Sequence, residues 1–197
     1  MRRALVAAVA AAGLACSSRH GATTTSEGIG ERVATYRLVL EDERGATRHV
    51  RLLVWVARPD RLHAEIVLPV GGVRYTLDAG GGRACVVDAE ERVAYAGEDG
   101  AVAVEALTGV RVSFTDAVAA LLDGANPPGL TAEREGDPPG ELPRRLRLAG
   151  GARSMTLTRE GRVRSAASRA ALGTGDPPPG LPVRPLADLA PVLKGVS

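Results

Sequence analysis

Apolar and polar residues alternate along most of the first half of the chain. In residues 33–40, Tyr36 and Leu38 fall on one face of an extended chain and Arg37 falls on the other. A period of two is that of a β-strand with one buried face. The same alternation, broken by short turns, predicts six strands at 33–40, 48–57, 61–68, 73–78, 83–88 and 92–96. Short turns between successive strands favour an antiparallel meander.

The predicted strands would share one apolar face. That face would be formed by Tyr36, Leu38, Leu40, Val50, Leu52, Val54, Leu62, Ile66, Val73, Tyr75 and Leu77.

The period changes to that of a helix after residue 112. Ser113 is placed to cap the helix N-terminus and Asp116 follows three residues later, which is the spacing of a capping box. Phe114, Val118 and Leu121 would lie on the apolar side, with Gly124 at the end of the helix. Residues 101–107 fit a short helix or another strand, and the sequence does not decide between them.

The last third of the chain contains turns rich in proline and glycine. Between and after these turns, residues 144–149, 154–159 and 162–168 are predicted as three more strands. Residues 185–193 are predicted to form a short closing helix, whose length Pro191 would limit.

The N-terminus has the pattern of an export signal. Met1-Arg2-Arg3 is followed by an uncharged run at 4–15, which is shorter than the roughly 20 apolar residues of a membrane-spanning helix. The run ends in Ala12-Gly13-Leu14-Ala15-Cys16, which resembles the lipobox of bacterial lipoproteins, with Cys16 as the lipidated residue. An ordinary secretory signal with an incidental cysteine is the alternative. We therefore expect a signal peptide at 1–15, a flexible tether at 16–30 and a single domain at 31–197.

Composition narrows the classes of function. The net charge is only +2 and aromatic residues make up 3%, which argues against a nucleic-acid partner. The three histidines and two cysteines lack metal-ligand spacing, and the chain has no nucleophile elbow or phosphate-binding loop. We expect no enzyme activity, no cofactor and no metal. Cys85 is predicted to be buried. His63 and Glu65 are predicted to lie on one exposed strand face, where they would take part in a cross-strand salt bridge.

The order of these elements resembles a known family. A lipobox and tether precede a meander containing ARPDRLHAEIVLPVGGVRYTLDAGGG, a strand ending in AYAGEDG, and the helix SFTDAVAALLDG. This order, over about residues 31–170, resembles the LolA/LolB superfamily of periplasmic carriers and outer-membrane lipoprotein receptors, and is most similar to its LolB-like lipoproteins. The resemblance implies a mainly β (α+β) fold: a strongly curved antiparallel sheet, an unclosed half-barrel, with short helices covering its concave face.

The resemblance also implies a function. The concave face would bind the acyl chains of lipids or lipoproteins, in a LolB-like role in lipoprotein localisation or lipid transfer. Its partners would be membrane lipid, lipoprotein acyl chains and a periplasmic LolA-like carrier. The protein would be a monomer, anchored by lipid on the periplasmic side of the outer membrane, since Ser17 rather than Asp follows Cys16. The candidate cavity residues are Tyr36, Leu38, Leu52, Val54, Ile66, Tyr75, Phe114 and Leu121. Leu68 and Val70 lie at the turn that matches the membrane-inserting loop of LolB.

Two other interpretations stay open. The inward residues form a filled core in a structural or interaction lipoprotein, which uses the half-barrel for docking and carries no lipid. Alternatively, the protein is a small-ligand sensor or a lipid-transfer subunit that works with a transporter.

Overall fold

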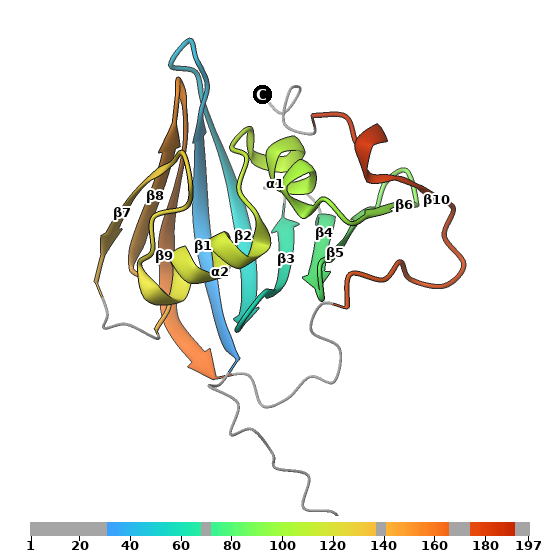
Figure 1. The fold of residues 1–197 in the computed structure, drawn as a ribbon, viewed down its shortest axis with the longest axis horizontal. Coiled ribbons are helices and arrows are strands. Elements are labelled where there is room, and N and C mark those ends of the chain that lie inside the picture. Colours follow the sequence, from blue (N-terminus) through green and yellow to red (C-terminus); the bar gives the residue numbers. More distant parts are fainter. Residues whose placement is uncertain (1–30, 68–71, 137–140, 166–173, 192–197) are drawn as a thin grey trace, which may run out of the picture.

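One curved sheet organises the molecule. The computed structural model describes residues 31–67, 72–136, 141–165 and 174–191. Within these residues ten strands form a single sheet of order β10-β6-β5-β4-β3-β2-β1-β9-β8-β7, whose two outermost strands do not pair with each other. Two helices lie across one side of it (Figure 1). The fold is therefore mainly β, an unclosed half-barrel with helices over its concave face.

The first six strands form the predicted meander, each pairing antiparallel with the next. Their bounds are β1 (Arg32–Glu41), β2 (Thr47–Ala57), β3 (Arg61–Val67), β4 (Val73–Gly80), β5 (Arg83–Asp88) and β6 (Val93–Gly97). Burial alternates along the strands, so that Tyr36 and Leu38 are buried while Arg37 between them is exposed. The period of two in the sequence is therefore the period of burial in the sheet.

The prediction that Val73 faces inward is wrong. Ile66 of β3 pairs with Tyr75 of β4, but the next residue, Val67, pairs with Val73, so that β4 contains an extra residue at this point. Such a bulge changes the relative direction of the side chains on its two sides, so Val73 does not share the face of Tyr75. Val73 is consequently 37% exposed.

Both helices follow strand β6. In α2 (Phe114–Asp123), Ser113 Oγ accepts a hydrogen bond from the amide of Asp116 at 3.1 Å, and Gly124 ends the helix in the left-handed conformation, as predicted. The undecided segment 101–107 is helical and belongs to α1 (Gly100–Thr108), whose first turn is capped by Asp99. The Asp99 side chain accepts a hydrogen bond from the amide of Ala101.

Polar contacts attach α2 to the sheet at the C-terminal end of the helix. Arg134 of β7 (Thr131–Glu135) donates through Nη1 to the carbonyl of Leu121 at 2.6 Å. Asp123 forms an ion pair with Arg58 in the turn after β2. A cation at this end of a helix also interacts favourably with the helix dipole. These contacts hold α2 over the concave face.

The second half of the sheet differs from the prediction in two strands. β8 (Arg145–Gly150) is as expected, but the strands predicted at 154–159 and 162–168 are one strand, β9 (Arg153–Ser165), with 166–168 outside the described residues. Gly161, with φ of 91°, lies where the pairing of β1 and β9 shifts register, so the predicted break is a bulge. β7 was not predicted, because its TAERE sequence has a single apolar residue.

The predicted closing helix at 185–193 is also wrong. Val183–Pro185 forms β10, which pairs parallel to β6, and only the 3₁₀ turn Leu186–Asp188 follows it. Because Pro185 is extended where it pairs with β6, the predicted helix cannot begin there. Residues 192 and 193 lie outside the described part of the chain.

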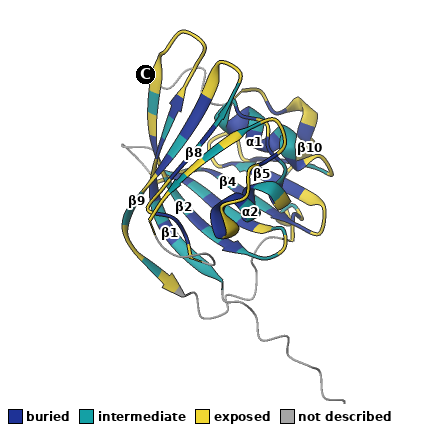
Figure 2. Cartoon of the chain, turned by 60° about the vertical axis from the view of Figure 1, so that its left-hand side comes forward, coloured by how far each residue is buried: buried dark blue, intermediate teal, exposed yellow. Residues whose placement is uncertain are grey.

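The core lies between the concave face and the helices. Figure 2 shows buried residues along the strands and on the inner sides of both helices, whereas the hairpin tips are exposed. Leu38, Val54, Val86 and Val118 are at most 2% exposed.

Candidate functional site

The helices and the concave face enclose a small apolar space, which we call the inner cavity. Its volume is about 80 Å³. Its walls come from β1 to β4, β9, both helices and the loop between them. The lining residues are Leu38, Leu52, Val54, Leu62, Ala64, Ile66, Tyr75, Leu77, Val104, Leu107, Thr108, Val112, Ala117, Leu121, Met155 and Leu157.

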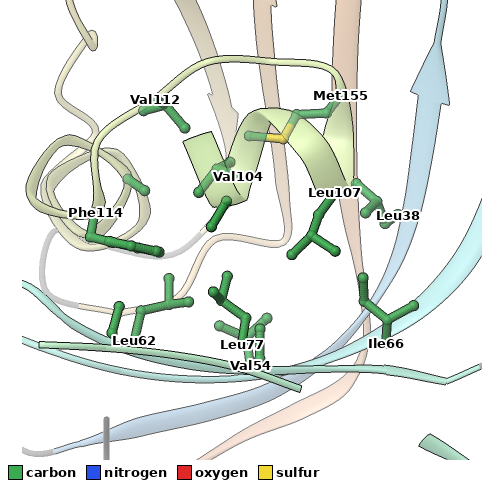
Figure 3. Close-up of a cluster of buried hydrophobic side chains, with 14 of the residues drawn as sticks. Leu38, Val54, Leu62, Ile66, Leu77, Val104, Leu107, Val112, Phe114 and Met155 are labelled. Carbon is green, nitrogen blue, oxygen red and sulfur yellow. The ribbon is translucent and has the colours of Figure 1, made fainter. Parts of the chain in front are cut away.

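Side chains from the sheet and from α1 point toward one another across this space. In Figure 3, Val54, Ile66 and Leu77 extend from the strands toward Val104 and Leu107 of α1. Only Tyr75 and Thr108 add polar atoms to the lining residues. The Thr108 hydroxyl donates to the carbonyl of Val104 at 2.7 Å, which satisfies it within the helix. The inner cavity therefore offers apolar contacts and no evident polar chemistry.

Tyr75 is held at the edge of the inner cavity by a polar cluster. The guanidinium carbon of Arg74 lies 5.1 Å from the centre of the Tyr75 ring, which is a cation–π distance. Arg74 Nη2 also donates to Oδ2 of the buried Asp88 at 3.3 Å. Burial raises the pKa of Tyr75 above its ordinary value.

Six of the eight candidate cavity residues from the sequence line this space. These are Leu38, Leu52, Val54, Ile66, Tyr75 and Leu121. Leu52 is only half-buried, and the other five are buried.

Tyr36 and Phe114 are buried but do not line the inner cavity. The Tyr36 hydroxyl donates to the carbonyl of Pro143 at 3.0 Å, which joins β1 to the residues before β8. The Phe114 ring lies against Gly100 and joins the starts of the two helices. These two predicted residues therefore hold the fold together rather than form the wall of the cavity.

Several lining residues were missed by the sequence reasoning. Val104, Leu107 and Thr108 come from α1, where a helical spacing of three and four residues was visible but did not exclude a strand. Met155 and Leu157 come from β9, which curves back beside β1. Their alternation within 154–159 was present, but no local pattern tells which strands become neighbours.

A second hollow, the mouth cleft, lies next to the inner cavity and shares Leu107 and Thr108 with it. Its volume is about 400 Å³. It lies between the ends of β1 and β2, α1, the start of β9 and the residues after β10. Its charged lining residues are Glu41, Asp42, Arg48, Glu105 and Arg153.

Most charged groups of the mouth cleft already have partners. Arg153 pairs with Glu43 at 3.3 Å and donates to the carbonyl of Gly109 at 3.4 Å, so it bridges the β1–β2 turn and the loop between the helices. Asp42 accepts hydrogen bonds from two amides of its own turn, which lower its pKa. Arg48 forms no hydrogen bond or ion pair with any residue that the structure describes.

A second titratable cluster lies on the outer face of the sheet. His63 Nδ1 of β3 is 2.5 Å from Asp78 Oδ1 of β4, which is the predicted cross-strand salt bridge. His63 Nε2 is also 3.4 Å from Oε1 of Glu65 on the same strand. The Trp55 ring meets the His63 ring edge-on with centroids 4.7 Å apart. Burial alone would lower the pKa of His63, but the hydrogen bonds and charges of the two carboxylates outweigh it and raise the pKa.

Cys85 is buried, as predicted, and is 1% exposed. Burial raises the pKa of its thiol to about 11. A protonated, enclosed thiol is a poor nucleophile.

Three predicted residues lie outside the described part of the chain: Cys16, Leu68 and Val70. Among the described residues, neither helix has the length and apolar content needed to cross a bilayer. The same residues contain no group of His, Cys, Asp and Glu side chains arranged to hold a metal ion. A scan against protein-family models finds no match for this chain, and a search of curated proteins finds no significantly similar sequence.

Proposed function

We propose that this protein is a LolB-like lipoprotein that binds acyl chains of lipids or lipoproteins between its concave face and its helices. Cys16 would anchor it on the periplasmic side of the outer membrane. Its role would be lipoprotein localisation or lipid transfer, with chains received from a periplasmic LolA-like carrier. Leu68 and Val70 would contact the membrane during transfer.

The observation that carries this proposal is the wall of the inner cavity. Aliphatic and sulfur-containing side chains from two distant parts of the sheet converge there with both helices. A wall of this kind recognises an apolar chain through buried area, at about 25 cal/mol per Å². The adjoining mouth cleft gives such a chain a route to solvent.

The volume of the inner cavity limits what it holds as it stands. At about 80 Å³ it is well below the roughly 300–1,000 Å³ of ordinary ligand pockets. An acyl chain therefore requires the helices or their side chains to move outward. The helices are the movable part in this proposal, because they contact the sheet mainly through side chains, whereas the strands are joined by backbone hydrogen bonds.

The same volume favours a second candidate function. In a structural or docking lipoprotein the half-barrel would be packed and would carry no lipid. A cavity of this size is compatible with ordinary imperfect packing of a core. The two candidate functions differ in whether the interior opens to admit an acyl chain.

Filling the inner cavity distinguishes the candidates. Ala117 of α2 lines the cavity, and Ala117→Leu adds three carbon atoms to it. Ala119 lies on the same helix but not on the cavity wall, so Ala119→Leu is the matched control. Both are made in the full chain with Cys16→Ser, and binding of a fluorescent fatty acid is measured beside thermal melting.

For a carrier, Ala117→Leu weakens fatty-acid binding and leaves the melting temperature unchanged or higher, because it fills existing space. Ala119→Leu changes neither quantity. Native mass spectrometry of protein purified without detergent is the companion measurement, and retained acyl lipid is the expected result. A lipid-free mass together with no fatty-acid binding would favour the packed, docking interpretation.

A further inference from the structure

The mouth cleft is where the polar end of a bound amphiphile would lie. The inner cavity and the mouth cleft share Leu107 and Thr108, so an apolar chain in the former ends in the latter. The inner walls offer no charged partner, and burying a charged headgroup among them would be costly. Any headgroup is therefore confined to the mouth cleft, whose charged residues determine its chemistry.

Arg48 is the cation of the mouth cleft that makes no hydrogen bond or ion pair within the described residues, although its charge acts on the Asp42 carboxylate. By strand alternation it lies on the same face of β2 as Val50 and Val54, which point to the concave interior. It is half-buried. Arg153, the other arginine of the cleft, is engaged with Glu43 and Gly109. A guanidinium placed in this way suits a phosphate or carboxylate.

Carboxylates stand in the same cleft. Asp42 accepts hydrogen bonds from two amides of its own turn through Oδ1, and Glu105 pairs with Arg111 through Oε2. In the described part of the chain, Oδ2 of Asp42 and Oε1 of Glu105 have no hydrogen-bond partner. A purely anionic headgroup at Arg48 would be repelled by these groups, and a purely cationic one would be repelled by Arg48. A headgroup with both charges complements the cleft.

The inner cavity must widen even for one acyl chain, and a single chain requires the smallest movement of the helices. The inner cavity, at about 80 Å³, is smaller than the roughly 150 Å³ cavity that holds one benzene molecule in another protein. The mouth cleft, at about 400 Å³, falls in the range of small-molecule sites. Space for several chains side by side is lacking in the described residues.

We propose that the mouth cleft binds the zwitterionic headgroup of a single-chain amphiphile, with its anionic group on Arg48 and its ammonium group toward Asp42 and Glu105. This is the chemistry of a lysophospholipid. The inference rests on the proposed function, since it assumes that the chain itself enters the interior.

Four probes with the same dodecyl chain test the headgroup: dodecylphosphocholine, dodecyl phosphate, dodecyltrimethylammonium and dodecyl maltoside. Binding to the full chain with Cys16→Ser is measured by calorimetry below the concentration at which each probe forms micelles. Dodecylphosphocholine is expected to bind about tenfold more tightly than each of the others, the size of one charge-assisted hydrogen bond.

Three variants assign the charges. Arg48→Gln is expected to weaken the binding of dodecylphosphocholine about tenfold and to leave the affinity for dodecyl maltoside unchanged. Glu105→Gln keeps an acceptor for Arg111 but removes the charge, and is expected to strengthen the binding of dodecyl phosphate. Arg61→Gln is the control, since Arg61 is exposed on the outer face of β3. Melting temperatures confirm that each variant is folded.

The outcomes separate this inference from the proposed function. If none of the four probes binds, the proposed function fails and the headgroup site fails with it. If all four bind equally, or dodecyl phosphate binds most tightly, chain binding survives and the zwitterionic site is overturned. Equal weakening of all probes by Arg48→Gln in a folded protein overturns it as well.

Discussion

The ring of Phe114 lies so close to Gly100 that a Cβ atom at position 100 would stand 1.9 Å from its Cε2 atom. Gly100 begins α1 and Phe114 begins α2, so this contact joins the N-terminal ends of the two helices that cover the concave face. Glycine is needed here for close approach and not for an unusual backbone conformation.

Gly100→Ala is therefore expected to destabilise the protein. Alanine in place of glycine in a helix ordinarily gains about 0.5–1 kcal/mol. Here the clash with Phe114 is expected to reverse the sign and cost about 1–3 kcal/mol, as overpacking does. Urea unfolding measures the free energy. Adding Phe114→Leu to Gly100→Ala should recover part of the loss, and a Gly100→Ala protein as stable as the parent would contradict the contact.

Tyr36→Phe tests a residue that the sequence placed in the cavity and the structure places outside its wall. Loss of the hydroxyl leaves the Pro143 carbonyl without this donor in a buried position. The expected cost is about 1–3 kcal/mol in unfolding free energy. Fatty-acid affinity should stay unchanged in the folded variant. If Tyr36→Phe lost fatty-acid binding without losing stability, Tyr36 would have to be counted among the binding residues.

Alternation of apolar and polar residues was sufficient to predict the meander and the inward direction of Leu38, Val54 and Ile66. It predicts directions because a strand has a period of two whatever surrounds it. The capping residues predicted α2 for an equally local reason. Where the structure differs, the cause is a partner distant in sequence. Val73 turns outward because β4 gains a residue against β3, and Val183–Pro185 extends because β6 is available for pairing.

The residues of the candidate site could be predicted from the sequence to a similar extent as the fold. Alternation named most of the sheet residues that line the inner cavity, but it could not tell Tyr36 and Phe114 apart from them. Tyr36 is held by Pro143, which is distant in the sequence. Phe114 lies against Gly100, which no local sequence pattern marks as its partner. The mouth cleft was not predicted at all, since Arg48 and Arg153 meet there only because β9 returns beside β1.

Val70→Glu tests the membrane-contacting loop, which stays a prediction from the sequence. A carboxylate must be desolvated or protonated to enter hydrocarbon, so liposome association of the Cys16→Ser chain should fall. Val70→Leu should bind equally or more strongly, by about 0.8 kcal/mol for the added methylene. Melting temperatures of both variants are matched first. Equal liposome binding by the two would remove the loop from the mechanism.

His63 gives the stability a pH dependence. Because the pKa of His63 is raised in the folded protein, the folded state favours the protonated ring. Its contribution is complete below the unfolded pKa of about 6.5 and disappears as the pH rises through the raised folded pKa. His63→Gln should therefore cost more stability at about pH 5.5 than at about pH 8.5.

Unfolding in urea at both pH values measures this difference, and the chain's one tryptophan, Trp55, reports it by fluorescence beside His63. His49→Gln is the matched control, because His49 is exposed on β2 and forms no ion pair with the described residues. An equal cost of His63→Gln at the two pH values would show that folding does not raise the pKa of His63.

The Cys85 thiol should be almost inert in the folded protein, because burial raises its pKa to about 11 and only 1% of the residue is exposed. Residues 174–176 lie against β5 beside it: a Cβ atom on Gly175 would stand 2.5 Å from the carbonyl oxygen of Arg83, and Asp176 pairs with Arg83 at 2.5 Å. Gly175→Ala should displace this segment and speed the reaction of Cys85 with Ellman's reagent in the Cys16→Ser chain.

Gly180→Ala is the matched control for that experiment. Gly180 also has a positive φ, of 84°, so alanine is strained at both positions, but nothing lies within 4 Å of its added Cβ. Backbone strain alone would speed the reaction equally in the two variants, whereas displacement of the segment speeds it only in Gly175→Ala. Rapid labelling of the parent protein at neutral pH would show instead that Cys85 is open to solvent without any change in sequence.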